Sequence, residues 1–244
     1  MPHAKVPKQT QPLWKEWDYK AQKKGVRSTV YSVNGDEYTG EWLDNKKHGK
    51  GTQKWKKSGA LYDGDWKYGK RNGFGTLSVP HEEGGYKRIY SGGWKNDKRH
   101  GYGTNFYSAE EYYEGEWYAD KRSGWGRMYF ADGSIYEGEW YNDERNGQGM
   151  LRLGETSVKA STDNRYEGSW KNDKKNGPGK FFYLDKGQVY EGVWVDNIAK
   201  CGTIVDFGRE GAPDPTQYPI PEVKLRDADS VLQEAEEMFL PEDD

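Results

Sequence analysis

One motif recurs along the chain: a tyrosine, a glycine and a tryptophan at alternate positions, then two glycines seven and nine positions after the tryptophan. One copy consists of Tyr136, Gly138, Trp140, Gly147 and Gly149. Six complete copies begin at Tyr38, Tyr62, Tyr90, Tyr113, Tyr136 and Tyr166, and a seventh copy with a shorter turn begins at Tyr190. A unit that returns every ~20–50 residues predicts a repeat array with atypical copies at its ends.

The spacing inside one copy predicts a β-strand. Residues at i, i+2 and i+4 of a strand lie on one face, so Tyr136, Gly138 and Trp140 share a face while Glu137 and Glu139 point to the other. A glycine inside a strand marks a close approach by other atoms. We therefore expect each strand glycine to make room for aromatic rings from neighbouring strands.

The segments between the copies predict turns and no helices. Asn-Gly pairs follow three of the tryptophans, at residues 72–73, 146–147 and 176–177, and such pairs favour hairpin turns. Each copy then forms one hairpin, and successive hairpins join as an antiparallel meander. The predicted fold is all-β: an elongated, twisted, single-layer sheet of about fifteen strands, ~4.8 Å apart and therefore about 70 Å long.

These motifs resemble a known family. The copy at Tyr62 reads Tyr62-Asp63-Gly64-Asp65-Trp66, followed by Gly73-Phe74-Gly75-Thr76, and it is similar to the MORN repeat, the membrane occupation and recognition nexus motif. The resemblance covers about residues 38–205. It implies a cytoplasmic or cytoskeletal setting in a cilium or flagellum, in the sperm axoneme or at the acrosome.

The pattern divides the chain into five parts. We predict a flexible arm at 1–12, a degenerate capping repeat at 13–37, seven repeats at 38–205, a Pro-rich extended linker at 206–226 and an amphipathic helix at 227–240. The apolar face of that helix comprises Val231, Leu232, Ala235, Met238 and Phe239. This tail either packs on the chain's own sheet, which is the more common arrangement, or docks on a second copy or another protein.

Composition supports order without a conventional core. The net charge is only −3, and 11 Trp and 19 Tyr stand mostly at regular positions, so ring stacking can replace aliphatic packing. The single cysteine excludes an internal disulfide. The sequence has neither an apolar signal core at its start nor an apolar run of ~20 residues, so we expect a protein that is neither secreted nor transmembrane.

The sequence predicts no enzyme, cofactor or metal site. The Gly-x-Gly pairs do not open a helix after a parallel strand, as a phosphate loop would. The four histidines lack ligand spacing. Carboxylates such as Glu114 and Glu137 recur at equivalent positions, which indicates a solvated face, whereas catalysis needs one distinctive constellation. Cys201 has no histidine partner, and we expect it to pack against its neighbours.

The aromatic face is the first candidate binding surface. Rows of Tyr and Trp rings would form a groove for a partner segment, because they provide large contact areas at low entropic cost. An equally favoured alternative is that the same rings pack between the strands and are not available to a partner. The candidate groove residues are Tyr62, Trp66, Tyr90, Trp94, Tyr113, Trp117, Tyr136, Trp140, Tyr166 and Trp170.

A basic rim is the second candidate surface. Stacked hairpins would align the basic pairs of the first turns, Lys46, Lys47, Lys70, Arg71, Lys98, Arg99, Lys121, Arg122, Lys174 and Lys175. Such a stripe could meet acidic lipid or the acidic tails of tubulin. Turn aspartates such as Asp97 dilute it, and a charge run is more often a solvated edge. Nucleic-acid binding is not expected, since the chain is slightly acidic overall.

Together these features predict a non-enzymatic scaffold or adaptor that holds axonemal or cytoskeletal proteins through the aromatic groove and the tail. A homodimer, formed through a sheet end or the tail, is a further expectation. The alternative is a peripheral membrane adaptor that binds acidic phospholipids, such as phosphoinositides, through the basic rim.

The tail prediction can be tested by deletion. Removing residues 227–244 should leave the sheet folded but lower the oligomer mass or the recovery of partners, because the apolar face of the helix would serve docking. Circular dichroism and light scattering measure the two effects. A lost β-sheet signal would instead show that the helix is a required cap.

Overall fold

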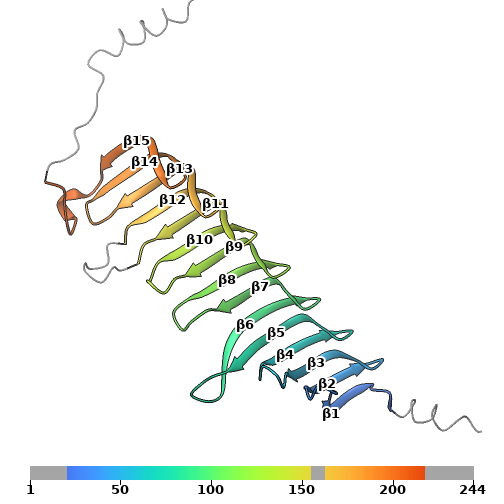
Figure 1. The fold of residues 1–244 in the computed structure, drawn as a ribbon. Helices are drawn as coiled ribbons and strands as arrows, with labels where there is room; N and C mark the ends of the chain where they lie inside the picture. The colour runs from blue at the N-terminus through green and yellow to red at the C-terminus, as the bar shows by residue number, and fades with distance from the viewer. Residues whose placement is uncertain (1–20, 155–162, 218–244) are drawn as a thin grey trace, which may run out of the picture.

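The computed structural model describes residues 21–154 and 163–217, which form one open antiparallel sheet (Figure 1). Its fifteen strands follow one another in sequence order, and each pairs with the next. They are β1 Gly25–Tyr31, β2 Glu37–Leu43, β3 Lys46–Lys54, β4 Leu61–Lys67, β5 Lys70–Pro80, β6 Tyr86–Lys95, β7 Lys98–Phe106, β8 Tyr112–Tyr118, β9 Lys121–Tyr129, β10 Ile135–Tyr141, β11 Glu144–Arg152, β12 Arg165–Lys171, β13 Lys174–Tyr183, β14 Gln188–Val195 and β15 Ile198–Asp206. The predicted all-β, single-layer meander is confirmed.

Both predicted ends lie partly outside the described residues. The arm at 1–12 and the helix at 227–240, with its docking residues Val231, Leu232, Ala235, Met238 and Phe239, lie wholly outside. Within the predicted cap at 13–37, β1 pairs with β2 and places Gly25 opposite Trp42, as Gly49 stands opposite Trp66 in the next repeat. Strand β1 thus occupies the place of the second strand of a repeat.

The hairpin turns differ from the Asn-Gly prediction. Lys67 pairs directly with Lys70, which leaves only residues 68–69 for the turn, and both have positive φ, at 50° and 88°. The equivalent pairs 44–45, 96–97, 119–120, 142–143, 172–173 and 196–197 also have positive φ. This is the two-residue turn that suits the twist of a hairpin, and Asn, Asp and Gly tolerate it best.

The Asn-Gly pairs instead lie inside strands, at bulges. In the β4–β5 hairpin the register shifts between Gly64 and Trp66, and Gly73 has φ 109°. The shift leaves Asp65 without a register partner on β5, and its carbonyl accepts a hydrogen bond from the Tyr62 hydroxyl at 3.1 Å. Positive φ at a glycine serves a bulge as well as a turn, so the Asn-Gly signal identified the wrong feature.

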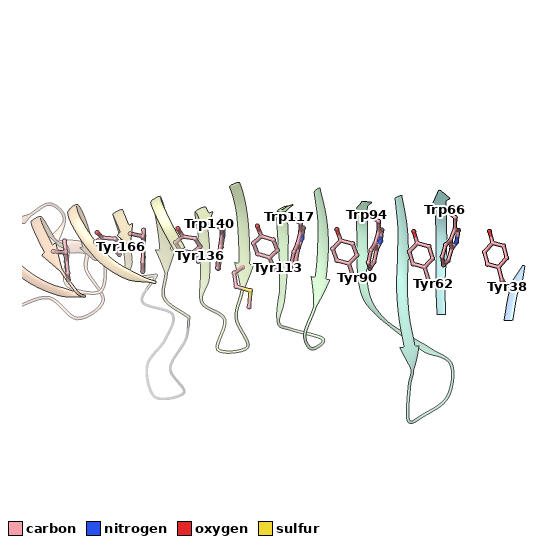
Figure 2. Close-up of a cluster of buried hydrophobic side chains, with 13 residues drawn as sticks. Tyr38, Tyr62, Trp66, Tyr90, Trp94, Tyr113, Trp117, Tyr136, Trp140 and Tyr166 are labelled. Carbon is pink, nitrogen blue, oxygen red and sulfur yellow. The ribbon is translucent and has the colours of Figure 1, made fainter. Parts of the chain in front are cut away.

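The core is a line of rings on one face of the sheet (Figure 2). Over Gly75, the second glycine of a Gly-x-Gly pair, lies the Tyr62 ring, and a Cβ on this glycine would collide with the Tyr62 hydroxyl. A Cβ on the strand glycine Gly64 would collide with the Gly75 backbone. The expectation that glycine makes room for rings therefore holds most directly for the Gly-x-Gly pair, whereas Gly64 permits close strand approach.

The chain after β15 folds back on the sheet. Residues Arg209–Gly211 form a short 3-10 helix, and the Asp214 N–H donates to the Asp185 carbonyl at 2.8 Å. The described part of the predicted extended linker is therefore bent and docked at the β13–β14 turn, because its backbone groups find partners there. Cys201 is exposed, contrary to the packing prediction, since β15 is the outer strand of the described sheet.

The glycine requirement leads to a prediction. Gly126→Ala should lower the free energy of unfolding by about 1–3 kcal/mol, because its Cβ would collide with the Tyr113 ring. Gly208→Ala is the matched control, since a Cβ there meets nothing within 4 Å, and its effect should stay within ~0.5 kcal/mol. Urea unfolding followed by circular dichroism measures both. Equal effects of the two substitutions would contradict the proposed packing.

Candidate functional site

An unbroken aromatic ladder runs along the sheet. Each tyrosine meets the tryptophan of its own repeat edge-to-face, at centroid distances of 5.0–5.5 Å. Each tyrosine from Tyr38 to Tyr166 also meets the tryptophan of the following repeat, at 5.3–5.7 Å. The ladder therefore joins all seven repeats, from Trp42 to Tyr190.

The polar atoms of the ladder bind the backbone. Each tyrosine hydroxyl from Tyr38 to Tyr166 donates to the carbonyl three residues later, as Tyr113 does to Glu116 at 3.0 Å. The indole N–H groups of five tryptophans donate to a glycine carbonyl of the preceding repeat, as Trp140 does to Gly126 at 3.2 Å. Burial raises the pKa of Tyr166 to about 12, so this hydroxyl stays protonated and can donate.

The structure brings all ten predicted groove residues together, but inside the ladder. Tyr62, Tyr113, Tyr136 and Tyr166 are 0% exposed, and the other six rings are at most 6% exposed. A partner therefore cannot lie directly on these rings. They support a surface that other side chains form.

Those other side chains include a flank row, which faces the tyrosines from the neighbouring strands. It consists of Gln53, Leu77, Asn105, Met128, Leu151 and Phe181. Leu77, Leu151 and Phe181 are half-buried and pack against the ladder, whereas the other three are buried. The accessible apolar part of the flank row thus comprises Leu77, Leu151 and Phe181.

The two members of each predicted basic pair have different surroundings. The second member stands over a tryptophan ring of the next repeat: the guanidinium carbon of Arg122 lies 4.1 Å from the Trp140 ring centroid. Arg71 and Arg99 repeat this contact at 4.1 Å, and the ammonium groups of Lys47 and Lys175 do so at 4.7 and 4.8 Å. Arg145, which follows Glu144 and belongs to no basic pair, makes the same contact at 4.3 Å. Burial lowers the pKa of Lys47 and of Lys175.

A turn aspartate of the next repeat completes this clamp. The Asp143 carboxylate accepts the Arg122 backbone N–H at 2.9 Å and its Nε–H at 3.3 Å, and the Asp143 carbonyl accepts from Nη2 at 2.6 Å. Arg71 binds Asp97, Arg99 binds Asp120 and Arg145 binds Asp173 in the same way. Sequence reasoning took these aspartates as diluting the rim and missed their pairing with the next repeat.

The first member of each pair is exposed. Lys46, Lys70, Lys98, Lys121 and Lys174 all lie on the surface at the start of their strands. Lys174 forms an ion pair with Asp196 at 3.2 Å, and Lys121 donates to the Asn142 side chain at 3.1 Å. The predicted rim of ten basic side chains is thus reduced to five exposed lysines.

The opposite face carries acidic side chains and an exposed aromatic row. Phe74, Tyr102 and Trp125 occupy the middle position of Gly-x-Gly on β5, β7 and β9 and are 60%, 59% and 51% exposed. We call these three residues the outer aromatic row. Sequence reasoning missed it, although the alternation of faces and three large residues at one repeat position could have revealed it.

The described residues show neither a metal site nor a membrane helix. No group of three or more His, Cys, Asp or Glu side chains within residues 21–154 and 163–217 could hold an ion. No helix in the same part of the chain is long and apolar enough to span a bilayer.

The ladder, the bulged hairpins and the single open sheet define a repeat protein, and comparison with known families agrees. The family model of the MORN repeat matches residues 38–59, 62–78, 90–104, 113–135, 136–154 and 166–187. The hairpin of β14 and β15 lies beyond these matches, yet Trp194 continues the ladder. The chain belongs to the MORN repeat family.

Particular relatives are similar over almost their whole length. MORN repeat-containing protein 3 of Xenopus laevis is 62% identical over 243 residues, which covers 99% of each chain. The protein of the same name from Homo sapiens is 65% identical over 240 residues, covering 98% of this chain and 97% of the relative. That of Mus musculus is 59% identical over 246 residues, covering 100% and 99%.

The clamp predicts different effects for neighbouring basic residues. Arg122→Ala should lower the free energy of unfolding by about 2 kcal/mol, because it removes the contact with Trp140 and the two side-chain hydrogen bonds to Asp143. Lys121→Ala, the matched control, should change it by less than ~0.5 kcal/mol. Thermal and urea unfolding measure both. An equal loss for the two variants would show that the clamp does not stabilise the array.

Proposed function

We propose that this protein is a non-enzymatic scaffold that binds partner proteins along the aromatic face of its sheet. Membership of the MORN family supports a protein-binding or membrane-associated repeat protein. The observation that carries the proposal is the accessible apolar part of the flank row, Leu77, Leu151 and Phe181, which packs against an interlocked ladder. Such a surface holds a partner segment without rearranging, which reduces the entropic cost of binding.

The setting that we propose is the cilium or flagellum, with axonemal or cytoskeletal proteins as partners. The support for this part is the family resemblance. A long sheet that spans several partner sites suits a structural component, because each repeat offers the same register of side chains. The proposal includes two further means of attachment to partners, the tail and a homodimer.

The alternative, a membrane adaptor acting through the basic rim, has weaker support. Five of the ten basic side chains are held over rings or by aspartates, so the charge available to acidic phospholipid or tubulin tails is about half of that predicted. Isolated lysines on a surface with acidic neighbours give modest attraction that salt screens.

Substitutions on the two surfaces separate these functions. Leu77→Gln with Leu151→Gln should abolish the labelling of axonemal partners in ciliated cells, whereas Lys46→Glu, Lys70→Glu and Lys98→Glu together should leave it unchanged. Glutamine is compatible with the fold, because Gln53 occupies the equivalent position. Proximity labelling measures partners, and flotation with phosphoinositide liposomes measures membrane binding.

The opposite pattern would support the membrane adaptor. Two results together would overturn the scaffold proposal. In the first, the wild-type protein floats with the liposomes and the three charge reversals abolish this flotation. In the second, the glutamine substitutions leave the labelling unaffected. Circular dichroism of each variant confirms that the sheet is retained.

A further inference from the structure

The outer aromatic row forms a straight line across the strands. The glycines that follow its members, Gly75, Gly103 and Gly126, are connected by consecutive pairings through Gly92 and Gly115. Phe74, Tyr102 and Trp125 therefore share one register. Adjacent strands lie about 4.7–4.9 Å apart, so rings on every second strand are separated by roughly 9.4–9.8 Å.

This spacing matches one turn of a polyproline II helix. That helix has three residues per turn and rises ~3.1 Å per residue, so it repeats every ~9.3 Å. A segment lying across the strands would place every third residue over one ring of the row. Aromatic-lined grooves bind such segments in other proteins, because the helix is preformed and loses little entropy.

The surface between the rings has the shape for this contact. A shallow hollow of ≈ 180 Å³ lies between Tyr102 and Trp125, and Glu114, Gly126, Arg127 and Glu137 also line it. It is large enough for one proline ring. The exposed side chain of Trp125 carries an indole N–H that can donate to a carbonyl of the bound segment.

The charges around the row are mainly negative. Glu116 and Glu139 accept the backbone N–H groups of Trp125 and Gln148, and Glu114 accepts from the Tyr102 hydroxyl. None of these three carboxylates forms an ion pair in the part of the chain that the structure describes. Two nearby cations are each bound to a carboxylate, Arg127 to Glu137 at 2.7 Å and Lys50 to Asp65 at 2.6 Å. The surface therefore favours basic residues between the prolines.

We propose that the outer aromatic row binds a short, basic polyproline II segment of a partner protein. Residues i, i+3 and i+6 of the segment pack on Phe74, Tyr102 and Trp125, and Arg or Lys between them face Glu114 and Glu116. Sheet twist accumulates, so a straight helix remains in register over only these few strands. The row lies on the face opposite the flank row, so this proposal is independent of the scaffold proposal.

The chain's own Pro-rich segment fits this surface poorly. Residues 213–221 include four prolines, but Asp214 and Glu222 are acidic, and no basic residue lies between Arg209 and Lys224. Like charges on the segment and on the row oppose docking. The occupant that the charges favour is a segment of another protein.

Peptide binding to the full chain tests the proposal. A fluorescent peptide of three Pro-Pro-Arg repeats should bind in fluorescence anisotropy. Peptides of three Pro-Pro-Glu or three Gly-Ser-Arg repeats should bind at least about tenfold more weakly, because they lack the charge or the preformed helix. Trp125→Ala and Tyr102→Ala should each weaken binding about tenfold. The control Tyr31→Ala, also at an exposed aromatic residue, should have no effect.

Four results would overturn the proposal. They are no binding of the Pro-Pro-Arg peptide, equal binding of the Gly-Ser-Arg peptide, unchanged binding after Trp125→Ala, and binding that appears only after Pro213, Pro215, Pro219 and Pro221 are changed to Ala. The last would assign the row to the chain's own segment. Tyr102 and Trp125 are both exposed, so their substitution by alanine should leave the sheet folded, and circular dichroism checks this.

Discussion

The edge-to-face contact between a tyrosine and two tryptophans determines how this sheet can exist as a single layer. A sheet normally buries one face against a second layer of structure. Here the ring of each tyrosine from Tyr38 to Tyr166 lies over a glycine backbone, meets tryptophans on both sides and binds a carbonyl through its hydroxyl, as Tyr113 does. Such ring pairs add about 0.5–1.5 kcal/mol each beyond burial, and the array sums them between neighbours.

This construction assigns different tasks to the two faces. The largest rings of the ladder face are buried and stabilise the array, so the proposed partner surface there is the flank row, which the ladder supports. The opposite face contributes no rings to the ladder. Its carboxylates still brace the bulges, as Asp65 does by accepting the Phe74 N–H at 2.8 Å, while the rings of the outer aromatic row remain exposed.

Much of the fold could be predicted because its signals are local. The alternation of Tyr62, Gly64 and Trp66 defines a strand and its inner face within five residues, and its repetition gives the number of strands. The turns were misplaced because Asn72-Gly73 suits a bulge as well as a hairpin turn. The candidate site was predicted only in part: the rings were identified, but their burial depends on neighbouring repeats.

The sequence by itself determined the strands, their faces and the family, since each depends on residues close together in the chain. Only the tertiary structure decided which side chains remain available. Lys70 and Arg71 are adjacent basic residues, yet Arg71 lies over Trp94 and binds Asp97, which is 26 residues away, while Lys70 stays exposed. The register between separate repeats fixes that difference, and no local pattern contains it.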